Sequence, residues 1–594
     1  LSATRDRGKK RKKKRSNNQM AKKFARRRNH GTDVDSDTYQ YMVRILELIR
    51  GTFPSNEEKL LFVNNVYEQT IDHEIEYARN QLGSRVVETL LKYANLEAIQ
   101  RLVDAFGSSL RLLSNDRFAS HVLQKIVLVC ADRGNRDANI KTSSGSDETA
   151  DAEVEIVETE VRSYNDIVLK LSRYFINNIE EFISDTYANH LLRTVIECLG
   201  GLIDKPENEN KKNLVLSTKR AVIQEYKDLL IQSSKRLLNW PQFLEFGQEE
   251  LTSGLLQSVL YALKDIDSEI MESYINKITK ECFAPGTDES LSNIFGTDSS
   301  IRLLEACLAS ATPESFRNIY ERFFQGKLKQ LSLTQNTNFS VQRLIDNCPT
   351  KEDFEKIFDE ISPHFSDIRY VAHTGIFASA GNACLRLQTK QGAFVTEITK
   401  MLECESPDKQ SQIVTCIATL KTQKQLEKLT NDTGAKMFIN LHGSLIVQAI
   451  VNFNKPIKMV NALLDMSNEE LTYLFGDPKG SRIADAFMDS KYIGEKSREK
   501  LTKKLQGCWA QLAQSIHGSR SLEKIWMRAQ SNQRMSIMEE LAAAGESLRS
   551  TKSGKIISTK FNVPLFARSK KDWLEFQGKE EKTLKSNRRL SYRY

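Results

Sequence analysis

The sequence predicts an all-α protein, an α-solenoid of about eleven helical repeats that form a curved array with terminal caps. Three observations support this fold class. The chain has 594 residues, which is too many for one compact core. Helix-breaking residues are scarce, with 11 Pro and 27 Gly. A helical pattern also recurs at an interval of mostly 36 to 38 residues, which is typical of stacked helical repeats.

Each repeat is predicted from a residue that starts its second helix, with apolar helical periodicity on both sides. These starting residues are Ser84, Ser120, Asn189, Ser253, Ile301, Asn338, approximately Gly375, approximately Ser411, Ser444, Ser481 and Ser519. The longer intervals contain polar segments, which we interpret as insertions at about 131–163 and 200–213. One such unit buries too little apolar surface by itself, so the core exists only where units stack.

The charge distribution divides the chain into a tail and a body. Residues 1–30 carry a net charge of +13, whereas the remainder carries −4. We therefore predict a basic disordered tail with nuclear and nucleolar targeting at 1–36, a repeat array at 37–551, and a C-terminal cap with a second basic tail at 552–594. A polyanion would have to meet a local stripe of the body or the tail.

The tripeptide Gly-Ser-Arg occurs three times, and each serine is followed four residues later by a carboxylate. Residues i and i+4 lie on one face of a helix, so a hydroxyl and a carboxylate stand side by side with a guanidinium beside them. This trio can bind the edge of a nucleobase and stack on its ring. A serine at a helix start is more often an N-cap. Three copies in register with one repeat favour the base-binding interpretation, because capping does not require the arginine.

Other function classes receive little support from the sequence. The nine cysteines are scattered and form no Cys-x-x-Cys pair, which argues against disulfides and zinc modules and fits a reducing compartment. We find no signal peptide and no apolar run long enough for a membrane span. No catalytic motif frames the histidines. We therefore expect no enzyme activity, no catalytic residue, no cofactor and no metal.

Several second-helix segments resemble the RNA-binding helix of a Pumilio (PUF) repeat. They are Asp116–Lys125, Asp185–Arg193 and Thr337–Arg343. The resemblance covers most of residues 70–530. Together with the basic ends and the insertions, it is closest to the divergent nucleolar Pumilio-like family, and within it to the fungal members.

In that family, the first, second and fifth residues of a five-residue window on the second helix bind one base. The first and fifth residues contact the base edge, and the second stacks between bases. The resemblance implies the following RNA-binding residues: Ser84, Arg85, Glu88, Ser120, His121, Gln124, Asn189, His190, Arg193, Arg302, Glu305, Asn338, Phe339, Gln342, Ser444, Gln448, Ser481, Arg482, Asp485, Ser519, Arg520 and Glu523. Ser-Arg-x-x-Glu resembles the guanine reader, and Asn338 with Phe339 and Gln342 resembles the uracil reader. The window at Ser253 has Gly254 at its second position and therefore no stacking side chain.

The resemblance implies an RNA-binding ribosome-biogenesis factor of the nucleus and nucleolus. Its expected partners are single-stranded precursor rRNA and proteins of the small-subunit preribosome, and it would shield a cleavage site from premature nuclease processing. We expect a monomer without a membrane partner. The alternative is a protein-binding α-solenoid scaffold or import-type factor, which would fit the near-neutral body. A nuclease is disfavoured because the sequence shows no cluster of carboxylates that could hold a catalytic metal.

Overall fold

The computed structural model describes residues 31–135, 158–202, 220–287, 290–406, 412–433 and 438–578. The described residues are helical and contain no strand, apart from one isolated bridge between Gly31 and Asn80. The chain separates into two compact units. The first comprises residues up to 285 and 292–311, and the second comprises 286–291 and the residues from 312 onward.

The first unit contains the following helices, of which η2 is π-helical: α2 (Ser36–Ile49), α3 (Asn56–Glu68), α4 (Glu74–Arg79), α5 (Gln81–Leu91), α6 (Leu96–Phe106), η1 (Gly107–Ser109), α7 (Leu110–Ser114), α8 (Ala119–Gly134), α9 (Glu158–Asn177), α10 (Ile179–Phe182), α11 (Thr186–Leu199), α12 (Gln224–Leu238), α13 (Phe243–Phe246), α14 (Glu250–Leu263), α15 (Ser268–Lys277), η2 (Ile278–Cys282), η3 (Asn293–Phe295) and α16 (Asp298–Ser310).

The second unit contains these helices, of which η4 is π-helical: α17 (Pro313–Ile319), η4 (Tyr320–Phe324), α18 (Leu328–Leu333), α19 (Asn338–Asn347), α20 (Lys351–Ile361), η5 (Ser362–His364), α21 (Phe365–Tyr370), α22 (Gly375–Leu387), α23 (Gln391–Met401), α24 (Ile413–Thr419), α25 (Gln423–Thr433), α26 (Leu441–Val451), α27 (Ile457–Asp465), α28 (Asn468–Gly476), α29 (Ser481–Asp489), α30 (Glu495–Lys504), α31 (Trp509–Gln514), α32 (Ile516–Arg528), α33 (Ser531–Ala543), α34 (Gly545–Leu548), α35 (Lys552–Lys560) and α36 (Val563–Arg568).

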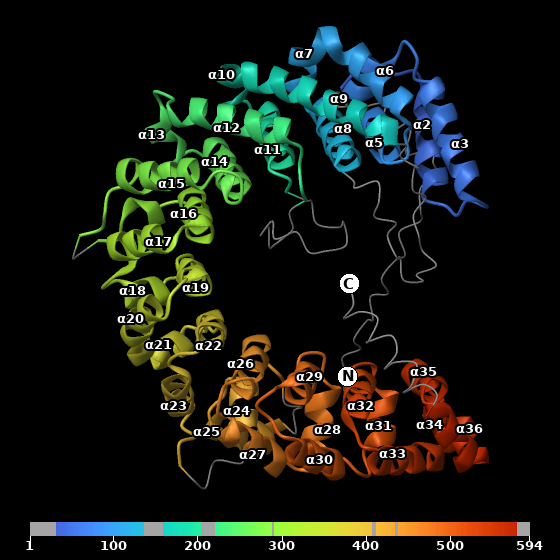
Figure 1. The fold of residues 1–594 in the computed structure, drawn as a ribbon, viewed down its shortest axis with the longest axis vertical. Helices are drawn as coiled ribbons and strands as arrows, with labels where there is room; N and C mark the ends of the chain where they lie inside the picture. Colours follow the sequence, from blue (N-terminus) through green and yellow to red (C-terminus); the bar gives the residue numbers. More distant parts are fainter. Residues whose placement is uncertain are drawn as a thin grey trace, which may run out of the picture. The chain divides into compact units, whose positions relative to one another are not determined.

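Each repeat has a long helix, a short helix and a third helix that carries the predicted five-residue window. We call the third helix the window helix. In the first unit the window helices α5, α8, α11, α14 and α16 pack one against the next, and α2 packs on α5. In the second unit α19, α22, α26, α29 and α32 do the same. Within each unit, Figure 1 shows the window helices as one row and most of the long helices as another. This arrangement is the predicted α-solenoid.

Five of the described window helices begin with a polar cap that lies four residues before the first window position. Asn80, Asp116, Asp185, Asn440 and Asp477 each accept hydrogen bonds from two backbone N–H groups at the start of the helix. These side chains satisfy donors that have no partner inside the helix. The serine of Gly-Ser-Arg therefore does not cap the helix, and the simpler capping interpretation is wrong.

The glycine of each Gly-Ser-Arg lies against the preceding short helix. A Cβ atom on Gly83, Gly480 or Gly518 would lie 2.4, 2.1 or 2.7 Å from the carbonyl oxygen six residues earlier in the chain. Thr252 and Thr337 occupy the same place in other repeats, and each hydroxyl donates to the carbonyl six residues before it, at 2.7 and 2.8 Å. In these three repeats the glycine therefore allows a close approach of the short helix, whereas α8 and α11 accommodate Ala119 and Ala188 at the same place.

Two predicted segment boundaries differ from the helices. Helix α8 continues to Gly134 and α9 begins at Glu158, so both ends of the expected insertion at 131–163 are helical. Residues 136–157 and 203–219, which contain most of both expected insertions, lie outside the described residues, as do 1–30 and 579–594 of the expected tails. At the C-terminal end, the ring of Phe561 stacks on Trp526 of α32 with 4.2 Å between centroids.

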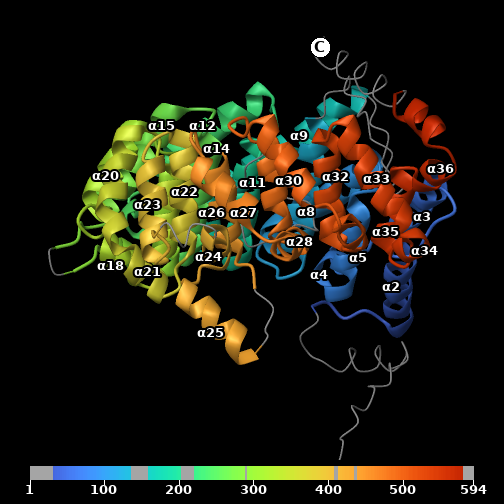
Figure 2. The ribbon, with the colours of Figure 1, turned by 90° about the horizontal axis from the view of Figure 1, so that it is seen from below.

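The tentative repeat near Ser411 is not a separate unit. Ser411 lies outside the described residues, and α24, which begins two residues later, takes the place of a short helix. A Cβ on Gly443 of α26 would lie 2.3 Å from a carbonyl of α24, at Ile417, as the other glycines do with their short helices. Helix α22 packs directly on α26. Helix α25 is inserted between α24 and α26, and Figure 2 shows it projecting from its neighbours.

Candidate nucleic-acid interface

The second window position is exposed in most window helices. In the first unit this holds for Arg85, His121, His190 and Arg302, and in the second unit for Phe339, Arg482 and Arg520. Phe339 is 59% exposed, so its ring is accessible for a contact. Because the helices of each row pack in register, these planar side chains follow one another along the row in each unit. Such a series of rings and guanidinium groups can stack on successive bases.

The first window position faces the protein. The side chains of Ser84, Ser120, Asn189, Asn338, Ser444 and Ser481 are all buried. The hydroxyl of Ser253 donates to the backbone carbonyl of Ser299 at 2.8 Å, and that of Ser444 donates to the carbonyl of Lys479 at 2.7 Å. Both acceptors lie two residues before the next window begins. In these two windows position 1 thus joins consecutive window helices, a role that the sequence motif alone did not indicate.

The fifth window position is half-buried and lies close to the next repeat. Glu88 is an example: burial raises the pKa of its carboxyl above the ordinary value, while the nearby charges of His121, Arg85 and Lys125 oppose the shift. His121 is the second window position of the following repeat. The Glu88 carboxylate and the His121 ring therefore face a common space, as a base edge and a stacking ring would require.

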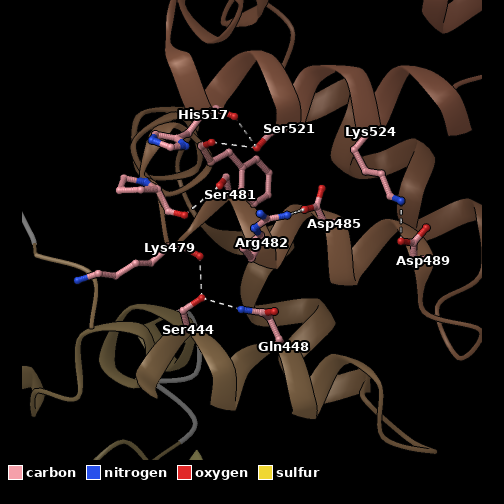
Figure 3. A network of polar contacts seen from close by, with 12 residues as sticks. Ser444, Gln448, Lys479, Ser481, Arg482, Asp485, Asp489, His517, Ser521 and Lys524 are labelled. Atoms are coloured by element: carbon pink, nitrogen blue, oxygen red, sulfur yellow. Dashed lines mark hydrogen bonds and ion pairs between the residues drawn. The ribbon is translucent and has the colours of Figure 1, made fainter. Parts of the chain in front are cut away.

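Three consecutive windows of the second unit show how such contacts are organised (Figure 3). On α26, Gln448 donates to Ser444 at 2.9 Å, which orients the amide of position 5. On α29, Arg482 pairs with Asp485 of its own window at 3.3 Å. On α32, Lys524 pairs with Asp489 of α29 at 2.6 Å. Side chains at positions 2 and 5 are thus held by bonds within their own helix, and an ion pair outside the windows joins α29 to α32.

The window on α22 starts one residue earlier than predicted. The hydroxyl of Thr374 is 2.8 Å from the ring nitrogen Nδ1 of His442 on α26. His442 lies two residues before the next window, at the place that Ser253 and Ser444 also reach, although they bond a backbone carbonyl there. A second contact between window helices supports the same register. Ser379 of α22 bonds Asp346 of α19, just as Ser258 of α14 donates to Glu197 of α11 at 2.7 Å. The corrected window has Gly375 at position 2 and Ala378 at position 5. It offers neither a stacking nor an edge-binding side chain.

Two windows have glycine at position 2, and in both the preceding repeat covers it. A Cβ on Gly254 would lie 3.0 to 3.5 Å from the guanidinium of Arg193, and a Cβ on Gly375 would lie 2.3 Å from the amide of Gln342. Arg193 and Gln342 are both at position 5 of the previous window. The amide of Gln342 also donates to Asn338 at 3.0 Å, so it is held on both sides.

Other sites were sought in the described residues. No group of three or more His, Cys, Asp or Glu side chains there could hold a metal ion. Of the helices in the described ranges, none is long and apolar enough to cross a membrane. All nine cysteines are free, and eight of them are buried. The window rows, with their exposed planar side chains at position 2, are the candidate site.

Comparison with known proteins identifies the family. The sequence profile of the NOP9-like PUF repeat domain matches residues 72–242 and 253–556, which is most of the chain. The chain belongs to this family. Among NOP9-like relatives, nucleolar protein 9 of Homo sapiens is 25% identical over 91% of this chain and 88% of its own length. Nucleolar protein 9 of Paracoccidioides brasiliensis strain Pb18 is 21% identical over 93% and 84%. The predicted resemblance to the nucleolar Pumilio-like family is confirmed.

A plant relative connects the family to solved structures. Pumilio homolog 23 of Arabidopsis thaliana is 23% identical over 93% of this chain and 74% of its own length. The structure of APUM23 with GGAGUUGACGG has a TM-score of 0.68, with 21% identity over 92% of this chain and 99% of that chain. This similarity confirms the PUF-repeat fold. Membership of the NOP9-like family supports the coarse prediction of an RNA-binding nucleolar protein, and the relatives' names describe no enzyme.

Proposed function

We propose that the protein binds a single-stranded segment of precursor rRNA along its window helices and shields a cleavage site in that RNA until small-subunit maturation requires it. The protein would act by occupancy and without catalysis. Its relatives are named as nucleolar proteins, and APUM23 was solved with the eleven-nucleotide RNA GGAGUUGACGG. Preribosomal proteins are the expected neighbours of such a complex.

One observation carries this proposal. In each unit, the exposed second window positions form a series of planar side chains, with a half-buried polar side chain at position 5 beside them. Each stacked base contributes about 1–3 kcal/mol with little dependence on its identity. The position 5 side chains add selectivity, because a carboxylate accepts from guanine N–H groups whereas an amide pairs with uracil. Windows such as that of Thr374, which lack both features, would leave their nucleotide unread.

Binding of a defined RNA tests the proposal. We would measure the affinity of the full chain for GGAGUUGACGG and for an RNA of the same composition in scrambled order, at several salt concentrations. Binding to the basic ends is electrostatic and contributes equally to both RNAs. We expect tighter binding of the ordered sequence at every salt concentration. Equal affinity would contradict base reading and would favour the protein-binding scaffold instead.

A single window provides a sharper test. Glu88→Ala is expected to weaken binding of a site that carries guanine at the matching nucleotide more than its adenine variant, because only guanine donates two N–H groups to the carboxylate. Thr89→Ala is the matched control, since Thr89 is exposed on the same helix outside the window and bonds only the backbone of Arg85. An equal loss for guanine and adenine sites would reject base reading by this repeat.

The shielding role needs its own measurement. A single-strand-specific nuclease would be applied to precursor rRNA that spans the 3′ end of the future small-subunit RNA, with and without the protein. We expect a protected stretch that includes the cleavage site. Crosslinking in cells would then show whether this junction is enriched, whereas enrichment of messenger 3′ ends would contradict the ribosomal assignment.

A further inference from the structure

The window on α14 has no side chain at its stacking position, yet the place is occupied. Gly254 lies under the guanidinium of Arg193, whose terminal nitrogen would be 3.0 Å and whose central carbon would be 3.2 Å from a Cβ on Gly254. Arg193 comes from α11, the preceding window helix. Its guanidinium therefore fills the space that a position 2 side chain of α14 would enter.

The guanidinium of Arg193 packs over Gly254, and no hydrogen-bond or ion-pair partner for it is found among the described residues. Its Nε atom is buried and has no hydrogen-bond partner, and Arg193 forms no ion pair within the described part of the chain. The side chain as a whole is half-buried. Keeping such a charged group in place without an acidic partner has a cost in desolvation. A group of this kind is well placed to receive a ligand that supplies a π-face or an anion.

The window of α11 also supplies an aromatic ring next to Arg193. His190 occupies position 2 of α11, three residues before Arg193 on the same helix face, and its ring is exposed. Burial first, and then the neighbouring charges of Arg193 and His121, lower the pKa of His190. The ring is therefore neutral at neutral pH, so it can lie close to the arginine without charge repulsion.

We infer that Arg193 serves as the stacking group of the α14 window, so that a base is held between its guanidinium and the ring of His190. This inference rests on the proposed RNA-binding function and changes the role of one residue within it. The Pumilio pattern places Arg193 at position 5, where it would bind a base edge of its own window. The structure instead directs its guanidinium across Gly254 of the next window.

The two roles differ in what they recognise. A guanidinium that binds a base edge donates hydrogen bonds and prefers guanine, as arginine does in the grooves of DNA. A guanidinium that stacks is tolerant of sequence, because every base has a π-face. The nucleotide bound between α11 and α14 must therefore carry a base, but its identity is not selected.

Arginine variants and abasic RNAs test the inference together. GGAGUUGACGG and eleven versions, each with one abasic nucleotide, would be titrated with the full chain and with Arg193→Ala. We expect Arg193→Ala to weaken binding of the intact RNA about tenfold. One abasic RNA should lose nothing further when Arg193 is replaced, and this RNA identifies the stacked nucleotide. At that nucleotide, all four bases should lose affinity to a similar extent.

Restoring a planar group from the other helix provides the decisive variant. With Arg193 replaced by alanine, Gly254→Arg places a guanidinium at position 2 of α14 and should recover most of the lost affinity. Arg193→Lys keeps the charge without the plane, so it should remain weak. Full affinity of Arg193→Lys, a loss restricted to one base, or no recovery by Gly254→Arg would each overturn the stacking role. Failure of the wild-type chain to prefer the ordered RNA would overturn the proposed function and this inference with it.

Discussion

Replacing Gly480 by alanine tests whether the glycine of Gly-Ser-Arg serves packing. The added Cβ would lie 2.1 Å from the carbonyl oxygen of Leu474 and 3.0 Å from its carbonyl carbon, so the start of α29 must move away from α28 by about 1 Å. Overpacking of this kind costs about 1–3 kcal/mol. The backbone of Gly480 is right-handed, with φ −67°, so alanine regains about 0.4–1 kcal/mol from the unfolded state. The net destabilisation is about 1–2 kcal/mol.

Native-state hydrogen exchange measures this locally, which suits a repeat array that does not unfold as one unit. We expect amides of α28 and α29 to exchange roughly tenfold faster in Gly480→Ala. Gly392→Ala is the matched control, because Gly392 lies in α23 with no atom within 4 Å of the added Cβ, and that variant should exchange more slowly in its helix. If α29 exchanged no faster than in the wild type, close packing would not explain the glycine.

Three further predictions follow from contacts in the window helices. Burial raises the pKa of Glu88, so the ionised carboxylate is disfavoured in the fold. Glu88→Gln should therefore unfold at a higher temperature than the wild type. This difference in unfolding temperature should grow as pH rises through the raised pKa and vanish below the ordinary value. Ser444→Ala, which removes the hydrogen bond to Lys479, should cost about 1 kcal/mol, and unchanged exchange in α26 and α29 would argue against this bond. Arg520→Ala should weaken RNA binding up to about tenfold. Arg482→Ala should weaken it less, because Arg482 must first release Asp485 before it can stack. Fluorescence anisotropy that showed the reverse order would contradict this reasoning.

The sequence predicted the repeat and the windows because both depend on local, periodic features. Apolar spacing defines the buried face of each helix, and the spacing of the windows follows from it. The α22 window was displaced by one residue, since Gly375 resembles the glycine that precedes other windows but takes position 2. Contacts with other repeats identify the start, such as that from Thr374 to His442, 68 residues away. Contacts between repeats are not encoded in any short stretch of sequence.

The roles of individual window residues were harder to predict. A serine such as Ser84 or Ser444 has the same appearance in a motif whether it binds a base or a backbone carbonyl, and burial decides between them. Arg193 departs from the family pattern, and no neighbouring residue in the sequence explains the departure. The reason lies 61 residues further along the chain, at Gly254, where the missing side chain leaves room. Such compensation between repeats becomes visible only when the helices are stacked.

The insertion of α25 has a consequence for how this protein measures RNA. Sixty-nine residues separate Ser444 from Gly375, yet α26 still packs directly on α22, so the added chain leaves the stacking of the row unbroken. If RNA binds along the window helices as proposed, the length of its footprint is expected to follow the number of docked helices rather than the length of the polypeptide. Foreign sequence inserted into α25 should accordingly leave the stacking of the window helices unchanged. This helix is therefore a suitable place for a reporter or an affinity tag.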